Sequence, residues 1–146
     1  MGSIQAFARS TRHYSSAGEA VDPAAEKEKA AKRIENMVKD NRVMLFMKGT
    51  KIFPQCGFSN TAVQVLRAVD CDFYTFDVLS DPFIREGVKQ YSEWPTIPQL
   101  YVNGEFVGGS DIMIELFQVS RTPGISPQCP ACSWFHIRGF LSLSML

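Results

Sequence analysis

Residues 43–59 have the sequence VMLFMKGTKIFPQCGFS, and this stretch decides the fold. Its first five residues, Val43 to Met47, are all apolar, which is typical of a strand buried on both faces of a sheet. A loop follows, and Cys56 then begins a segment with apolar residues at helical spacing. Strand, loop and helix follow one another as in a βα unit. The residues predicted to share the buried helix face are Phe58, Ala62, Val65, Leu66 and Val69.

The sequence on either side of this unit predicts four more elements and a hairpin turn. Proline after a capping residue, alternating apolar residues and an Asn-Gly pair mark the helix starts, strands and turn. The predicted fold class is therefore α/β, one domain with a central mixed sheet flanked by helices. The flanking elements are an amphipathic helix capped at Asp22-Pro23 (22–41), a strand (73–78), a helix capped at Asp81-Pro82, a hairpin (99–108) turning at Asn103-Gly104, and a helix ending at Phe117.

The four cysteines do not have the regular spacing of a disulfide framework. Ser59 stands three residues after Cys56, where a redox enzyme of this build has its second cysteine, so Cys56 cannot close a local disulfide. Cys71 is either a structural residue or a distant resolving thiol for Cys56. The pair Cys129 and Cys132 has the CxxC spacing of redox and zinc sites, but no second ligand pair accompanies it, which favours an incidental occurrence.

Cys56 is the main candidate for chemistry. At a helix start, unpaired N–H groups and the positive end of the helix dipole favour a thiolate and lower its pKa below the free value of about 8.5. The alternative is a buried cysteine that acts as a small apolar residue. Because Gly57 and the polar Ser59 and Asn60 suggest an open site, we expect a nucleophile or a soft metal ligand.

Other residues are suited to holding a charged, peptide-like ligand near Cys56. Lys48 follows the buried strand at the carboxyl end of the sheet, although a lysine there is often only solvated. A cis bond before Pro98 would free the Ile97 backbone for a ligand, whereas a trans turn would not. Ser110 and Asp111, after Gly108-Gly109, begin a helix whose N–H groups suit a carboxylate, unless Ser110 is only an N-cap.

The net charge, the hydropathy and the composition of the two ends of the chain bear on nucleic-acid binding, membrane insertion and targeting. The formal net charge of zero gives no signal for nucleic acid, and no apolar run reaches the roughly 18 to 20 residues that span a bilayer. Residues 1–21 are basic and rich in hydroxyl residues, with no acid before Glu19, as in a mitochondrial transit peptide; an unstructured basic terminus is the alternative. Residues 119–146 contain several prolines and no amphipathic period, and we expect a poorly ordered tail.

Taken together, these motifs closely resemble the monothiol glutaredoxins, in particular the mitochondrial single-domain type. The resemblance covers about residues 30–118, so that residues 22–118 are the expected glutaredoxin domain, whereas residues 119–146 bear no likeness to the family. It implies the thioredoxin fold with a four-stranded sheet. The matching motifs are Lys48-Gly49-Thr50, Cys56-Gly57-Phe58-Ser59, Trp94-Pro95-Thr96-Ile97-Pro98-Gln99 and Gly104-Glu105-Phe106-Val107-Gly108-Gly109-Ser110-Asp111.

The resemblance also implies a ligand and a role for each site residue. Lys48 and Arg85 would contact the glycine-end carboxylate of glutathione, and Ile97 would pair its backbone with the cysteinyl unit. Ser110 and Asp111 would take the γ-glutamyl end. Family members assemble a 2Fe-2S cluster in a homodimer, with Cys56 of each subunit and one glutathione thiol beside it as the sulfur ligands.

Three functions are consistent with the sequence. The first is a glutathione-dependent carrier in the mitochondrial matrix that passes a 2Fe-2S cluster to apo iron-sulfur proteins. The second is a weak enzyme, a glutathione-dependent oxidoreductase in which Cys56 reduces protein-glutathione mixed disulfides. The third, suggested by the atypical tail, is an isoform too unstable for either task.

Overall fold

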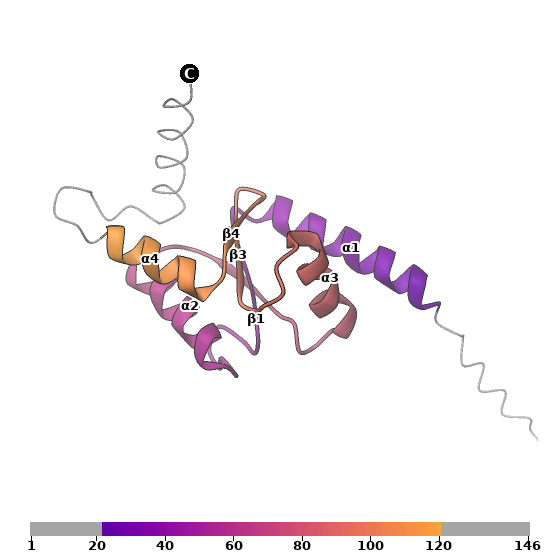
Figure 1. Cartoon of the computed structure of the whole chain (residues 1–146), viewed down its shortest axis with the longest axis horizontal. Helices are drawn as coiled ribbons and strands as arrows, with labels where there is room; N and C mark the ends of the chain where they lie inside the picture. The colour runs from indigo at the N-terminus through magenta and orange to yellow at the C-terminus, as the bar shows by residue number, and fades with distance from the viewer. Residues whose placement is uncertain (1–21, 121–146) are drawn as a thin grey trace, which may run out of the picture.

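The computed structural model describes residues 22–120 and contains the expected mixed sheet (Figure 1). Its strand order is β2-β1-β3-β4. The central strand β1 (Val43–Met47) runs parallel to β2 (Tyr74–Asp77) and antiparallel to β3 (Gln99–Val102). The hairpin is also present, because β3 pairs antiparallel with β4 (Glu105–Gly108).

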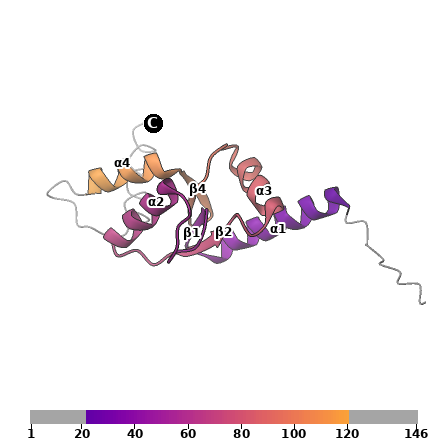
Figure 2. The ribbon, with the colours of Figure 1, turned by 90° about the horizontal axis from the view of Figure 1, so that it is seen from below.

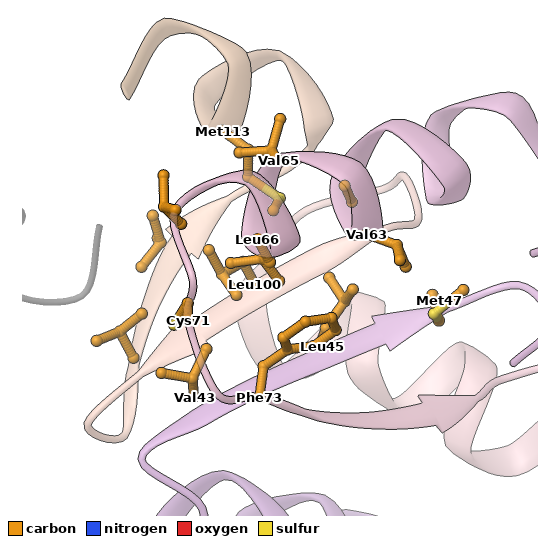
Figure 3. Packing of buried hydrophobic residues seen from close by; sticks show 14 residues of the cluster. Val43, Leu45, Met47, Val63, Val65, Leu66, Cys71, Phe73, Leu100 and Met113 are labelled. Carbon is orange, nitrogen blue, oxygen red and sulfur yellow. The ribbon is translucent and has the colours of Figure 1, made fainter. Parts of the chain in front are cut away.

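One face of the sheet is covered by α2 (Gly57–Ala68) and α4 (Ser110–Ser120) (Figure 3). Val43, Leu45 and Met47 point from β1 into this layer, where they pack with residues of both helices. Each is at most 3% exposed. Alternate residues of a strand point to opposite faces, so this layer accounts for three of the five apolar residues of β1.

The other face is covered by α1 (Pro23–Asp40) and α3 (Pro82–Ser92), which lie across the sheet from α2 and α4 (Figure 2). Met44 and Phe46 point from β1 into this second layer. Phe46 is fully buried and meets the Tyr101 ring edge-on, with 5.6 Å between the ring centroids. Two covered faces explain why β1 is apolar without alternation.

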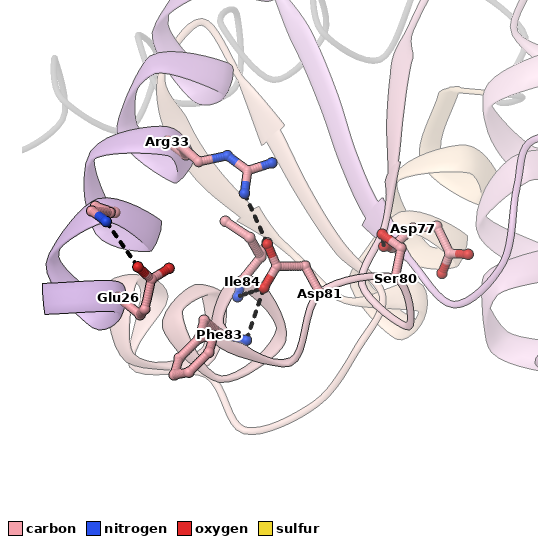
Figure 4. A network of polar contacts seen from close by, with 8 residues as sticks. Glu26, Arg33, Asp77, Ser80, Asp81, Phe83 and Ile84 are labelled. Carbon is pink, nitrogen blue, oxygen red and sulfur yellow. Dashed lines mark hydrogen bonds and ion pairs between the residues drawn. The ribbon is translucent and has the colours of Figure 1, made fainter. Parts of the chain in front are cut away.

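The predicted helix starts are confirmed. The Asp22 carboxylate accepts a hydrogen bond from the N–H of Ala24 and caps α1. Asp81 caps α3 through the N–H groups of Phe83 and Ile84, and its second oxygen pairs with Arg33 of α1 at 2.8 Å (Figure 4). One carboxylate thus fixes the start of α3 and ties it to α1.

Three sequence predictions about packing and element ends were wrong. Phe58 is 63% exposed, and Val63, at 1%, takes a core position on α2 instead. Phe58 lies in the first turn of α2, where its side chain lines a surface pocket and not the core. Tyr91, which the sequence pattern groups with the apolar residues Ile84 and Val88 of α3, is also exposed, and α4 extends to Ser120, beyond the predicted end at Phe117.

Some sequence predictions concern residues that the structure does not describe. The N-terminal segment 1–21, and Cys129 and Cys132 in the segment 121–146, lie outside the described residues. Within residues 22–120, no helix combines the length and the apolar character that a bilayer span requires.

Candidate functional site

The loop between β1 and α2 folds back, so that Cys56 lies beside the end of β1. The N–H of Gln55 donates to the C=O of Lys48 over 2.9 Å and closes the loop. Gly49 permits this close return, because its φ is +87° and a Cβ there would lie 2.4 Å from the carbonyl oxygen of Phe53. Lys48 and Cys56, which flank the loop, are thus brought close together at the carboxyl end of the central strand β1.

Ser59 is buried, which corrects the expectation that it would help to open the site. Its side chain is 0% exposed, and its Oγ accepts a hydrogen bond from the N–H of Lys48 at 3.1 Å. The small hydroxyl fits between the first turn of α2 and the end of β1, where it satisfies a backbone donor that would otherwise be unpaired. Ser59 therefore fixes Lys48 relative to Cys56.

Cys56 is the N-cap residue of α2, and its thiol is partly exposed. The sulfur makes no cap hydrogen bond of standard geometry. The backbone N–H of Ser59 nevertheless lowers the pKa of the Cys56 thiol, aided by the N–H of Phe58, the Ser59 hydroxyl and the Lys48 charge, while partial burial opposes them. The thiolate form is thus favoured, as the sequence predicted.

Replacing Ser59 with alanine is expected to raise the pKa of Cys56, because the variant loses a hydroxyl that stabilises the thiolate. The rate of alkylation by iodoacetamide follows the thiolate fraction, so the midpoint of its pH profile should move to higher pH. Thr61→Ala is a matched control, since the Thr61 hydroxyl bonds only the Gly57 carbonyl of the same helix. Equal midpoints for Ser59→Ala and the wild type would contradict this assignment.

Cys56 opens into a pocket of about 470 Å³. This volume lies within the usual range for small-molecule sites. All six site residues named from the sequence line this one pocket, although they come from the end of β1, the N-cap of α2, α3, the start of α4 and the loop before β3. They are Lys48, Cys56, Arg85, Ile97, Ser110 and Asp111.

The pocket is lined by more positively charged than negatively charged side chains. Lys48, Arg85 and Lys89 bring three cationic groups, whereas Asp111 brings one carboxylate from the start of α4. Glu86 pairs with Lys89 at 3.0 Å and lies 3.9 Å from the Arg85 Nε, but it does not line the pocket. The pocket therefore suits an anion that also has a positive group at one end.

Backbone groups complete the pocket wall. The Ile97-Pro98 peptide bond is cis, which is the alternative that frees the Ile97 backbone for a ligand. Ser110 begins α4 and is 7% exposed. The N–H groups in the first turn of a helix have no partners within the helix, so the start of α4 presents donors to a carboxylate.

The sequence did not indicate a place in the pocket for several residues that line it, among them Lys89, Trp94 and Phe58. Lys89 follows Arg85 by four residues on α3, a spacing that places both side chains on one helix face and that points to the same site. Phe58 had been assigned to the core because its spacing fits the buried stripe. No spacing rule places Trp94, because it lies in an irregular loop.

Cys71 lies in the core, at 8% exposure, beyond the carboxyl end of α2. Cys56 is at the amino end of the same helix, which has 12 residues and hence a length of about 18 Å. The two residues are therefore at opposite ends of α2. This placement favours the structural role for Cys71.

Known proteins with similar sequences are monothiol glutaredoxins. A family model described as glutaredoxin matches residues 43–107. An uncharacterized monothiol glutaredoxin of Synechocystis is 66% identical over 86 residues, which cover 59% of this chain and 80% of that protein. Glutaredoxin-related protein 5, mitochondrial, of Danio rerio is 52% identical over 60% of this chain and 57% of its own length. A chloroplastic monothiol glutaredoxin of rice is 54% identical over 58% of this chain and 51% of its own length.

Solved structures agree with the sequence matches. The solution structure of reduced poplar apo GrxS14 superposes with a TM-score of 0.55 at 47% identity, over 61% of this chain and 82% of that one. A monomeric truncated mutant of Trypanosoma brucei 1-C-Grx1 gives a TM-score of 0.58 at 41% identity, over 62% and 82%. The predicted thioredoxin fold is confirmed by these neighbours. This chain belongs to the monothiol glutaredoxin family.

Proposed function

We propose that the Cys56 pocket binds glutathione. This tripeptide has two carboxylates, one ammonium group and a thiol, which match the three cations, the single carboxylate and the cysteine of the pocket. Lys48 and Arg85 would hold the glycine-end carboxylate, and Ile97 the cysteinyl backbone. Ser110 and Asp111 would hold the carboxylate and the ammonium of the γ-glutamyl end.

The protein then acts as a glutathione-dependent carrier of a 2Fe-2S cluster, which is its cargo. The observation that carries this proposal is the partly exposed Cys56 thiol of lowered pKa, the one free cysteine of residues 22–120, with the buried Ser59 at the position of a second cysteine. Among residues 22–120, no three His, Cys, Asp or Glu side chains gather into a metal site. Two copies of the chain, each with one glutathione thiol beside its Cys56, would supply the four sulfur ligands.

Purification without oxygen, in the presence of reduced glutathione, iron and sulfide, tests this proposal. We expect a brown protein with visible absorption bands that elutes as a dimer in size-exclusion chromatography. Removing glutathione should bleach it and return it to the monomer, because half of the proposed sulfur ligands are exchangeable. A colourless monomer under the same conditions would refute the carrier function.

Replacing Lys48 with methionine is expected to weaken glutathione binding about fivefold, a loss of about 1 kcal/mol, because a partly exposed ammonium group contacts the carboxylate. Isothermal titration calorimetry with reduced glutathione measures the change. Lys39→Met is the matched control, since Lys39 pairs with Glu35 on α1 and does not line the pocket. An equal effect of both substitutions would assign the loss to net charge and not to the site.

The same site supports a second function, reduction of protein-glutathione mixed disulfides, because a thiolate at the mouth of a glutathione pocket is a nucleophile. The Cys56 thiolate would attack the glutathione sulfur and release the protein thiolate. A second glutathione thiolate would then attack the new mixed disulfide, which releases glutathione disulfide and restores Cys56. A colourless monomer with rapid deglutathionylation would favour this function over the carrier.

We place the protein in the mitochondrial matrix, on the basis of the basic, hydroxyl-rich composition of residues 1–21. The proposed partners there are apo iron-sulfur proteins that accept the cluster. The similar proteins include both mitochondrial and chloroplastic members. Fusion of residues 1–21 to a fluorescent protein distinguishes the two organelles by microscopy.

A further inference from the structure

The segment between α3 and β3, residues 93–98, forms neither a helix nor a strand, and its residues 94–98 line the pocket. Its first two N–H groups bond to carbonyls of α3, but the carbonyl oxygens of Trp94 and Thr96 accept hydrogen bonds from a side chain. Gln99, the first residue of β3, lies directly behind this segment and is 0% exposed. A fully buried amide side chain must find hydrogen-bond partners or destabilise the fold.

Gln99 uses both ends of its amide. Its Nε2 donates to the carbonyl oxygen of Trp94 at 2.9 Å and to that of Thr96 at 3.1 Å. Its Oε1 accepts from the Ser92 hydroxyl at 2.8 Å and from the Tyr101 hydroxyl at 3.0 Å. Two donors and two acceptor positions are thus all occupied.

The Tyr101 hydroxyl, at the Oε1 side of this network, donates its proton to Gln99. Burial raises the pKa of Tyr101 to about 12, so its hydroxyl keeps its proton at neutral pH. The Oε1 of Gln99 therefore faces the Tyr101 donor and shares the single Ser92 proton with the Val88 carbonyl, and its Nε2 faces the two loop carbonyls. The amide cannot rotate by half a turn without placing oxygen against oxygen.

The contact with Thr96 orients the next backbone donor. In a trans peptide group the C=O and the following N–H point in opposite directions. Because Gln99 holds the Thr96 carbonyl from behind the loop, the Ile97 N–H points away from Gln99. Within residues 22–120 no backbone or side-chain group accepts a hydrogen bond from this N–H, and Ile97 lines the pocket.

We propose that Gln99 is a positioning residue that orients the Thr96–Ile97 peptide group, so that the Ile97 N–H meets a backbone carbonyl of the bound tripeptide. This inference rests on the proposed binding of glutathione. Gln99 touches neither the ligand nor Cys56 and acts through the loop alone. Its role is to set affinity, and it leaves the reactivity of the thiol unchanged.

Gln99→Met tests the proposal, because methionine is similar in volume and cannot donate a hydrogen bond. We expect the dissociation constant for reduced glutathione, measured by calorimetry on the full chain, to rise about tenfold, as for the loss of one well-oriented hydrogen bond. The pH profile of Cys56 alkylation should stay as in the wild type. Tyr101→Phe is the matched control, since it removes one bond to Oε1 and leaves both bonds from Nε2; its dissociation constant should stay within about twofold.

Several outcomes would overturn the proposal. A dissociation constant for Gln99→Met within about twofold of the wild-type value would do so, as would an equal rise in Tyr101→Phe, which would indicate a general effect of the buried network. If the wild type itself does not bind glutathione, the proposed function fails. If the wild type binds glutathione and Gln99→Met binds it equally well, only the positioning role of Gln99 fails.

Hydrogen exchange in the wild type tests the same geometry without any substitution. The Ile97 amide should exchange readily in the free protein and become protected when glutathione is added. An Ile97 amide that is equally protected with and without glutathione would overturn the proposal, even if Gln99→Met did not fold.

Discussion

Replacing Cys56 with serine is expected to abolish both the colour and the cluster-dependent dimer of the glutathione-loaded protein. Serine keeps the size of the side chain, but its hydroxyl does not ionise near neutral pH and is a poor ligand for iron in such clusters. Visible absorption and size-exclusion chromatography after reconstitution without oxygen measure the effect. Deglutathionylation, if present in the wild type, should disappear in the same variant, because the nucleophile is lost.

The fold of Cys56→Ser should remain intact, since the thiol is partly exposed and makes no cap hydrogen bond of standard geometry. We expect its free energy of unfolding to stay within about 0.5 kcal/mol of the wild-type value, as for surface substitutions in general. A variant that folds and remains brown would show that other sulfur ligands hold the cluster, and it would refute the assignment of Cys56.

Replacing Phe46 with alanine is expected to lower the free energy of unfolding by about 3–5 kcal/mol. Phe46 is fully buried in the layer between the sheet and the α1/α3 pair, where its ring contacts those of Phe76 and Tyr101. Removing the ring leaves a cavity that the surrounding close-packed side chains cannot fill. Because small domains are stable by only about 5–15 kcal/mol, urea unfolding should show a large shift of the midpoint.

Phe53→Ala is the matched control, because the Phe53 side chain is 76% exposed in the loop before Cys56. The same change of residue type should alter the free energy of unfolding there by about 0.5 kcal/mol or less. Similar losses in the two variants would mean that Phe46 is not part of a close-packed core.

The arrangement of the strands and helices followed from local patterns in the sequence. The five apolar residues of β1 predicted a strand covered on two faces, and the structure places a helix pair on each. The capping residues Asp22 and Asp81 and the Asn103-Gly104 turn were also predicted correctly. These features depend on a few neighbouring residues, so a local pattern is sufficient to predict them.

The burial of individual side chains near the site did not follow from such patterns. Phe58 fits the apolar stripe of α2, but it lines the surface pocket beside Cys56 and is exposed. Ser59 is polar, and yet it is buried because it pairs with the N–H of Lys48. Helical spacing shows which residues share a face, but it does not show where along the helix the opposing layer ends.

By itself the sequence determined the fold class and the position of Cys56 at the start of a helix, and it indicated Lys48 and Asp111 as charged residues near it, whereas Arg85 and the tripeptide ligand were implied by the family resemblance. Only the tertiary structure decided that Lys89 belongs to the same pocket and that Gln99 holds the loop around Ile97 from behind. The physical reason is that helix starts and apolar runs are local properties of the chain. A pocket wall and a buried hydrogen-bond network depend instead on how separate elements meet, and that is fixed only when all of them pack together.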